Sequence, residues 1–332
     1  MRKRVKQVTR EVLPALLAVV LLAGASAHAT WQPHDTVQIL VGVGAGGAHD
    51  RTARLVQAMW QKTRNVPVPV VITNKPGGGG TRAWTELSQA VGKPHYLAIT
   101  GPTLLTNKIT GITPLSYSDF TQVAVLYSEA IAFAVSANSR IKDGRELARR
   151  LVTDPSSLVV GIATARGNTN HIAMASMTKA AGGDPRKLRV VVFDSGGKVV
   201  TALMGGHVDV VASNASNLVA QASKTKGLRL LAVSAPERVA GALADVPTWK
   251  ELGVNSVVAN FRGVMAPKGL AAEHVSYWER AFQRLTEQED WKREVRDNCG
   301  YGSFLGNAAA IDFLKEEYTE LQNVLRSLDM VK

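Results

Sequence analysis

The sequence predicts an α/β protein of two lobes, each built on a mostly parallel sheet with helices on both faces. Short apolar runs rich in Val and Ile alternate along the chain with amphipathic helical stretches, an order typical of strand-helix-strand units. One apolar run near the middle, 122–135, is long for a single strand. Such a run suits a segment that leaves one lobe and enters the other. The 332 residues also suffice for two apolar cores.

The individual elements follow from these patterns. Strands are expected at 37–43, 68–73, 96–100, 122–135, 158–163, 189–193, 208–212 and 229–234. Helices with an apolar face are expected at 50–64, 144–151, 170–181, 272–296 and 309–328. The run 257–265 is expected to return the chain to the first lobe. The predicted first lobe therefore comprises 30–127 and 256–332, and the second comprises 128–255.

The N-terminus predicts export. Basic residues at Arg2, Lys3, Arg4, Lys6 and Arg10 precede the apolar run 12–25, and Ala27-His28-Ala29 follows it. This order is typical of a cleaved signal peptide, here 1–29. The apolar run is shorter than the roughly 20 residues that span a bilayer. The alternative, an uncleaved anchor, is distinguished by sequencing the N-terminus of the mature protein.

Composition excludes several classes of protein. The net charge is +12, but basic blocks interleaved with aromatic residues are missing, so small anions are favoured over nucleic acid as partners. Cys299 is the only cysteine, so no intrachain disulfide can form. Neither a Gly-x-Ser-x-Gly elbow nor a His-Glu-x-x-His motif occurs, and the histidines are scattered. We therefore expect no enzyme activity, metal or cofactor; turnover of a substrate would favour the alternative, an unfamiliar periplasmic hydrolase.

The loop at 41–50 is the first candidate binding element. It ends a predicted strand and begins a helix, and its residues Ala45, Gly46 and Gly47 offer backbone N–H groups to an anion. Its glycines also satisfy the dinucleotide spacing, but the acidic residue expected after the second strand is absent. Asp50 either contacts the ligand or complements the helix dipole.

Other strand ends carry similar polar loops. The loop 164–171 gathers Arg166, Asn168 and Thr169, which suit a carboxylate, beside His171, which we expect to cap or pack. The four-glycine loop 75–81 is either a packing turn or a ligand contact. The full set of predicted ligand-binding residues is Ala45, Gly46, Gly47, Asp50, Thr100, Thr103, Arg166, Asn168, Thr169, Asp194, Ser195 and Ser213.

Several of these segments resemble one known family. They are AGGAHD at 45–50 with Arg54, NKPGGG at 74–79, GNTNH at 167–171, GGHVD at 205–209, and Arg238 followed by DVPTWKELG at 245–253. In order and spacing they resemble the tripartite tricarboxylate transporter substrate-binding proteins, also called the Bug family of periplasmic receptors. Within the last segment, Thr248 and Glu251 form a capping box before Gly253, which predicts a well-terminated helix.

The resemblance implies a type II periplasmic-binding-protein fold with a ligand cleft between the lobes. It implies a monomeric periplasmic receptor that captures a small organic carboxylate by closure. The ligand class includes dicarboxylates, tricarboxylates, aromatic carboxylates and acidic amino acids. Delivery to a membrane transporter of one large and one small integral subunit is implied; a receptor that feeds a signalling partner is the alternative. The sequence departs from the usual family pattern at 94–96 and 192–196, so the resemblance does not identify the ligand.

Overall fold

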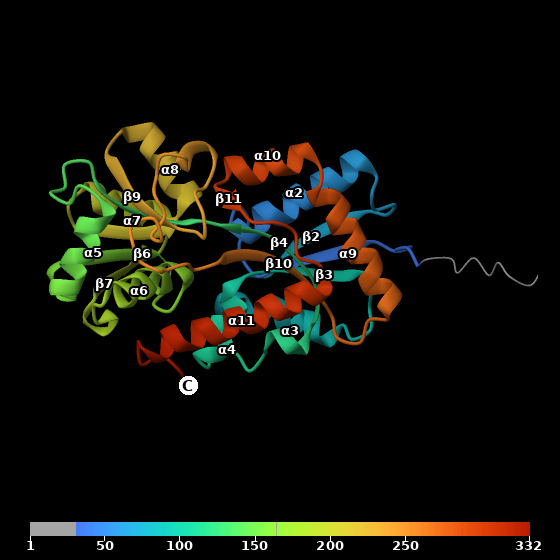
Figure 1. The fold of residues 1–332 in the computed structure, drawn as a ribbon. Coiled ribbons are helices and arrows are strands. Elements are labelled where there is room, and N and C mark those ends of the chain that lie inside the picture. Colours follow the sequence, from blue (N-terminus) through green and yellow to red (C-terminus); the bar gives the residue numbers. More distant parts are fainter. Residues whose placement is uncertain (1–30, 164) are drawn as a thin grey trace, which may run out of the picture. The chain divides into compact units, whose positions relative to one another are not determined.

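Two β-sheets organise the part of the chain that the structure describes. The structure is a computed structural model, in which residues 31–163 and 165–332 are described; the predicted signal peptide at 1–29 and Thr164 lie outside them. Within the unit 33–332, a six-stranded sheet and a five-stranded sheet each form the centre of one lobe (Figure 1).

The first lobe is built on the six-stranded sheet, in the order β11-β4-β10-β3-β1-β2. Its strands are β1 (Val37–Val41), β2 (Val70–Asn74), β3 (Tyr96–Thr100), β4 (Thr121–Glu129), β10 (Asn260–Ala266) and β11 (Gly300–Tyr301). Its helices are α2 (Ala48–Thr63), α3 (Thr81–Gln89), α4 (Pro102–Ile109), α9 (Ala272–Thr286), α10 (Glu289–Asp297) and α11 (Asn307–Arg326).

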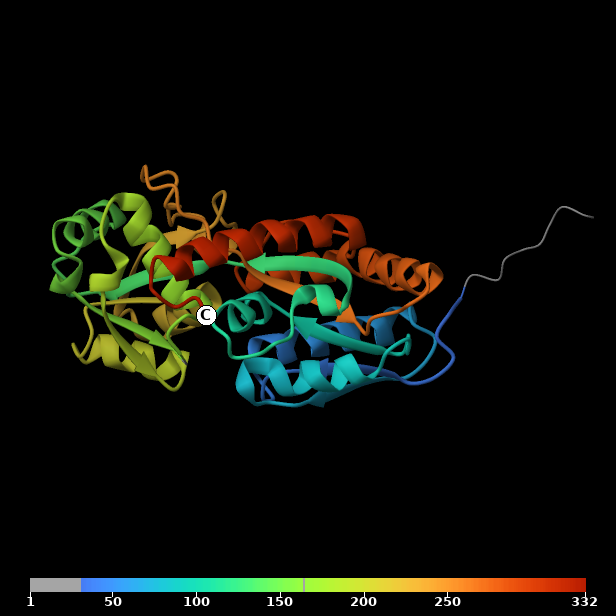
Figure 2. The same cartoon turned by 90° about the horizontal axis from the view of Figure 1, so that it is seen from below.

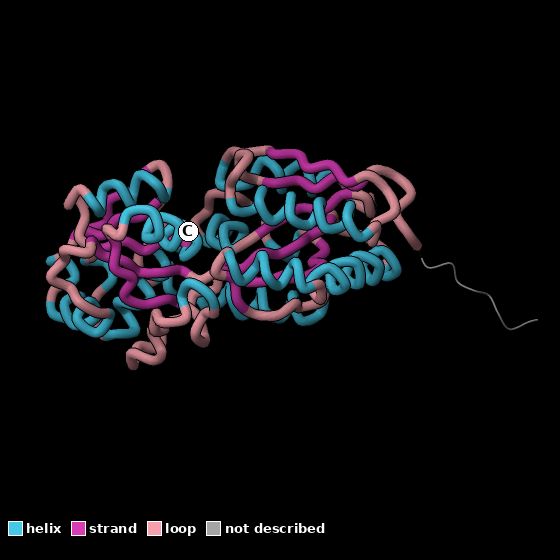
Figure 3. The backbone as a smooth tube through the Cα atoms, turned by 90° about the horizontal axis from the view of Figure 1, so that it is seen from above, coloured by secondary structure: helices cyan, strands magenta, loops and turns pink. Residues whose placement is uncertain are grey.

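The second lobe is built on the five-stranded sheet, in the order β7-β6-β8-β5-β9. Its strands are β5 (Ile131–Ser136), β6 (Val159–Ala163), β7 (Arg189–Phe193), β8 (Val210–Asn214) and β9 (Leu228–Ser234). Its helices are α5 (Gly144–Thr153), α6 (Thr169–Ala181), α7 (Gly196–Met204) and α8 (Ala215–Thr225). Figure 3 shows helices around the strands of both lobes, as the amphipathic patterns predict.

Both sheets are mixed, whereas the sequence predicts mostly parallel ones. Strands joined through helices do pair in parallel: β1 with β2 and β3, and β6 with β7 and β8. The strands with which the chain enters a lobe from the other one, β5 and β10, run the other way. Thus β10 is antiparallel to β3 and β4, and β5 is antiparallel to β8 and β9.

The long run at 122–135 changes lobes, as predicted. It forms β4 in one sheet and β5 in the other, separated by Ala130. The returning run forms β10, whose first residue, Asn260, pairs with Glu129 at the end of β4. The two crossings therefore lie side by side. The lobe boundaries at 127/128 and 255/256 stay a prediction.

The single helix expected at 272–296 is wrong, since the structure has α9 and α10 there. The break falls at Glu287 and Gln288, where Gln288 takes an extended conformation. Neither Gly nor Pro marks this break in the sequence. The turn lets Trp291 pack edge-on against Tyr127. We therefore attribute the break to tertiary packing and not to a helix-breaking residue. The sequence predicts that the loop 75–81 leads from a strand into a helix, and α3 begins there at Thr81. No helix is predicted at α4, α7 or α8, each of which begins at or shortly after the end of a strand.

The C-terminal helix contacts both lobes. Figure 2 shows α11 running along the first lobe toward the second, and it packs on β4, α4 and α6. Its Leu321 and Leu325 are buried in one apolar cluster with Ile172 and Met174 of α6. This helix is therefore a second physical link between the lobes beside the crossing strands.

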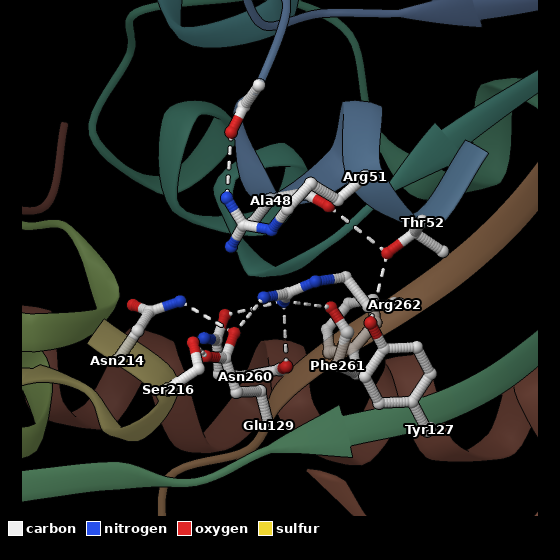
Figure 4. Close-up of polar contacts among 11 residues, drawn as sticks. Ala48, Arg51, Thr52, Tyr127, Glu129, Asn214, Ser216, Asn260, Phe261 and Arg262 are labelled. Atoms are coloured by element: carbon white, nitrogen blue, oxygen red, sulfur yellow. Dashed lines mark hydrogen bonds and ion pairs between the residues drawn. The ribbon is translucent and has the colours of Figure 1, made fainter. Parts of the chain in front are cut away.

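A buried ion pair lies where the two strands cross. Arg262 of β10 donates from Nη2 to Oε2 of Glu129 at 2.5 Å, and the two residues are only 2% and 4% exposed. From the second lobe, Asn214 donates to the same carboxylate at 2.7 Å and Ser216 donates to its other oxygen at 2.5 Å. Glu129 thus ties both crossing strands to the start of α8 (Figure 4).

Across residues 31–163 and 165–332, no helix combines the length and the apolar character that crossing a membrane requires.

Glu129→Gln should lower the free energy of unfolding by about 3–5 kcal/mol, because it leaves the buried guanidinium of Arg262 without its counter-charge. The double variant Glu129→Gln with Arg262→Met should recover most of this loss, since neither side chain is then charged. Urea unfolding followed by tryptophan fluorescence measures both. A single variant as stable as the unmodified protein would show that the pair does not hold the crossing together.

Candidate binding cavity

A cavity of about 720 Å³ opens between the two lobes. Residues from both sheets' strand-end loops line it, and most are polar or glycine. A cavity of this size takes a small organic molecule. Its position at the ends of strands, between two lobes, is the place where α/β folds commonly bind ligands.

The starts of five helices converge on this cavity. Its wall includes residues at or beside the first turns of α2, α4, α6, α7 and α8. The first N–H groups of a helix have no partner within the helix, and the helix dipole places partial positive charge there. Five such ends around one space favour an anionic group on the ligand.

Asp50 holds the loop before α2 in shape. Its carboxylate accepts hydrogen bonds from the backbone of Gly46 at 2.8 Å, from Asn74 at 2.9 Å and from Arg54 at 2.9 Å. Burial opposes its ionisation, but these hydrogen bonds outweigh burial and lower the pKa of Asp50 below 3.8. The side chain is 1% exposed and does not line the cavity. Asp50 therefore fixes the conformation of the loop and does not face the cavity itself.

The four-glycine loop at 75–81 packs closely against the start of the loop at 41–50. A Cβ on Gly42 would lie 2.6 Å from the Cα of Gly80, so the two backbones touch. Gly77, Gly78, Gly79 and Gly80 all have positive φ, a conformation that side chains disfavour. No residue of 75–81 lines the cavity. Of the two interpretations left open, this placement favours a packing turn.

The loop before α6 is held by its own side chains. Asn168 caps the helix by accepting from the backbone of His171 at 3.0 Å. In return, Nδ1 of His171 accepts from the backbone of Gly167 at 2.9 Å. His171 is 3% exposed and does not line the cavity, so its placement fits the capping or packing role that the sequence predicts rather than a ligand contact. Arg166 turns away from the cavity and donates to the carbonyl of Val190 at 3.0 Å.

The structure brings most of the predicted binding residues together. Those that line the cavity are Gly46, Gly47, Thr103, Asn168, Thr169, Asp194, Ser195 and Ser213. Those that lie outside its wall are Ala45, Asp50, Thr100 and Arg166. Thr100 is buried behind the wall, where its methyl group would lie 3.2 Å from a Cβ on Gly263.

Other lining residues were missed by sequence reasoning. Those in or next to the strand-end segments are Ala48, His49, Arg51, Asn170, Gly196, Gly197, Asn214, Ser216 and Asn217. Extending each loop into the first turn of its helix would have found them. Asn260, Arg262 and Asn298 come from a strand and from the end of α10. No local motif marks these three.

Of the charged side chains in the cavity wall, Asp194 and Arg262 form ion pairs and Arg51 does not. Asp194 forms an ion pair with Lys198, which lowers the pKa of its carboxyl. Arg262 is paired with Glu129, but no carboxylate among the described residues forms an ion pair with Arg51. Burial, together with the charge of Arg262, lowers the pKa of His49 to about 3, so its imidazole is neutral at neutral pH.

One group of side chains elsewhere in the described ranges has the spacing of a metal site. His34, Asp35 and His95 place one ligand atom each within 4.8 Å of one another. Nε2 of His95 already accepts from the backbone N–H groups of His34 and Asp35. None of the three lines the cavity.

The expected helix after Thr248 is reduced to a turn. Thr248 and Glu251 do exchange the two predicted capping hydrogen bonds, at 2.8 and 3.2 Å. However, residues 249–253 form turns and no α-helix. Gly253 has a positive φ and ends the segment after a single turn.

Stability should fall as the pH drops from about 6.5 to 4, partly through His171. Burial and the charge of Arg166 lower its pKa to about 4, so the unfolded chain takes up the proton first and folding weakens below pH 6.5. His171→Asn keeps an acceptor for Gly167 and removes this titration. Between pH 6.5 and 4, the free energy of unfolding of this variant should fall less steeply with decreasing pH than that of the unmodified protein, by up to about 1.4 kcal/mol per pH unit. Urea unfolding at pH 7, 5.5 and 4.5 measures the slope; equal slopes for the two proteins would contradict the assignment.

The sequence matches a known family over most of its length. Residues 52–329 match the tripartite tricarboxylate transporter family receptor. A UPF0065 protein of Bordetella bronchiseptica is 29% identical over 277 residues, covering 82% of this chain and 79% of the relative. A UPF0065 protein of Cupriavidus necator, from the gbd 5′ region, is 24% identical and covers 98% of both chains.

Solved structures share the fold. MatC from Rhodopseudomonas palustris, solved with bound malate, is 25% identical with a TM-score of 0.70, covering 88% of this chain and 99% of its own. A TctC solute-binding protein from Polaromonas has a TM-score of 0.75 at 23% identity, with 89% and 99% covered. A further R. palustris protein, solved with adipate, has a TM-score of 0.76 at 20% identity, with 90% and 99% covered. This chain belongs to the tripartite tricarboxylate transporter receptor family.

Proposed function

We propose that this protein is a periplasmic solute-binding receptor that holds a small organic carboxylate between its lobes and performs no chemistry on it. The observation that carries the proposal is the convergence of five helix starts on one open cavity lined mostly by polar residues and glycines. Their backbone N–H groups suit carboxylate oxygens. Export through the predicted signal peptide would place the protein in the periplasm.

The ligand carboxylate would bind between the starts of α2 and α6. The first turn of α2 faces the cavity with Ala48 and His49 from the first lobe, and Thr169 and Asn170 of α6 face it from the second. The N–H of Gly47, just before α2, already donates to the carbonyl of Gly44 at 3.1 Å. Asn170 is 7% exposed, and its Oδ1 has no hydrogen-bond donor among the described residues. Because Oδ1 accepts hydrogen bonds, it suits a hydroxyl or ammonium donor of the ligand rather than the carboxylate itself.

Closure of the lobes would bury the ligand. The two strand crossings meet at Glu129 and Asn260, which makes this point a natural hinge. A ligand that contacts both walls stabilises the closed arrangement only by the contacts that closure adds. For this motion we propose the lobes 30–127 with 256–332, and 128–255.

The relatives support this class of ligand and partner. MatC was solved with malate and another R. palustris protein with adipate, and both molecules are small dicarboxylates. The family is named for its transporter. Delivery of the solute to a two-subunit integral membrane transporter is the role we propose for this chain.

A thermal-shift screen tests the proposal. The mature protein should melt at a higher temperature with one or more carboxylates from a panel that includes malate and adipate, because a ligand that binds only the folded state stabilises it. Sugars and nucleotides should leave the melting temperature unchanged. A shift with these and none with any carboxylate would overturn the proposal.

Thr103→Trp should abolish the shift, since Thr103 lines the cavity from the start of α4 and an indole there fills part of the space. Val152→Trp is the matched control, because Val152 is 42% exposed on α5 and lies away from the cavity. Equal shifts in both variants would place the ligand elsewhere.

A further inference from the structure

A second, smaller cavity of about 250 Å³ adjoins the first. The two share Ala48, Arg51, Ser216, Arg262 and Asn298 as lining residues. Beyond this shared wall, the side cavity is closed mainly by α2, β4 and α10, through residues that include Leu55, Tyr127 and Val295. A ligand group that passed between these shared side chains would therefore enter the side cavity.

Arg262 presents an unused donor at this wall. Its side chain is 2% exposed. Nη1 donates to Asn260 and to the carbonyl of Phe261, and Nη2 donates to Glu129. Nε, in contrast, is buried and has no acceptor among the described residues. A buried N–H of a charged group without an acceptor is unfavourable, so an oxygen of the ligand in the side cavity would satisfy it.

Arg51 brings a second guanidinium to the same wall. It is held by a hydrogen bond of 2.7 Å from Nη1 to the carbonyl of Gly46, and no carboxylate of the described residues pairs with it. Figure 4 shows the guanidinium groups of Arg51 and Arg262 one above the other, with none of the drawn side chains between them. Two like charges that line one cavity favour an anion as the group they share.

The acidic residues near the shared wall leave Arg51 without a counter-charge there. Glu129 uses both carboxylate oxygens on Arg262, Asn214 and Ser216. Glu294 lines the side cavity, but it is not among the residues shared with the main cavity. The unneutralised charge at the shared wall is therefore positive and belongs to Arg51.

We propose that the side cavity is a subsite for a second anionic group of the ligand, bound between Arg51 and Nε of Arg262. The inference rests on the proposed function, because it assumes that a first carboxylate lies at the helix starts. It narrows the ligand class to molecules with two anionic groups. Arg51 and Arg262 are then the residues that distinguish these from monocarboxylates.

Titration calorimetry with matched probes tests the subsite. The probes are straight-chain dicarboxylates of four to seven carbons, the monocarboxylates of the same length, and the corresponding ω-hydroxycarboxylates. For the best dicarboxylate, Arg51→Gln should raise Kd roughly 10- to 100-fold, because a charge-assisted hydrogen bond is lost. It should change Kd of the other probes by less than about 3-fold.

Three variants complete the design. Glu294→Gln should leave dicarboxylate binding unchanged or tighten it, since it removes a negative charge from the lining of the side cavity. Leu55→Trp should weaken dicarboxylates selectively by filling the side cavity without changing charge. Arg149→Gln, on the exposed face of α5, removes the same charge as Arg51→Gln far from the wall and should have no effect.

The outcomes separate the subsite from the function. If monocarboxylates or ω-hydroxycarboxylates bind the unmodified protein as tightly as dicarboxylates, or if Arg51→Gln weakens all probes equally, the subsite is wrong and carboxylate binding stands. If the unmodified protein binds no carboxylate, the proposed function fails first. Selective loss of dicarboxylate binding in Arg51→Gln and in Leu55→Trp, with unchanged binding in Arg149→Gln, supports the subsite.

Discussion

The ion pair between Glu129 and Arg262 is the interaction on which the arrangement of the lobes depends. It lies where the chain leaves the first lobe and where it returns, and it recruits Asn214 and Ser216 from the second lobe. A buried charge is tolerated only when it is paired and hydrogen-bonded. Any rearrangement at the crossing must therefore preserve this network or exchange its partners.

The same network forms part of the cavity. Arg262, Asn214 and Ser216 all line it, so the groups that join the lobes also border the ligand. In a clamp of this kind, a ligand that contacts the crossing can influence closure directly. Helix α11, which packs on both lobes, restricts that motion from another side.

Much of the fold could be predicted from the sequence because its signals are local. Alternating apolar runs and helical faces gave the strands at 96–100 and 189–193 with their observed bounds, and the long run at 122–135 indicated a change of lobe. The break between α9 and α10 could not be predicted, since it depends on how Trp291 packs against Tyr127. The mixed sheets also had no local signal, because strand direction is set by the path between lobes.

The candidate site divides in the same way. Glycines and capping residues at strand ends identify loops, so Gly47, Asn168 and Ser195 were found. Arg166 lies in such a loop, but its guanidinium turns to the carbonyl of Val190, and the sequence does not specify that rotamer. Arg262 contributes to the wall because of the register of β10 on β4, which only the tertiary structure shows.

The central claim is that loops of both lobes hold one carboxylate. Amide hydrogen exchange, measured with and without a carboxylate that raises the melting temperature, tests this most directly. We expect slower exchange at the starts of α2 and α4 in the first lobe and of α6, α7 and α8 in the second, all on addition of the same ligand. Protection confined to one lobe, or found only outside these helix starts, would contradict it.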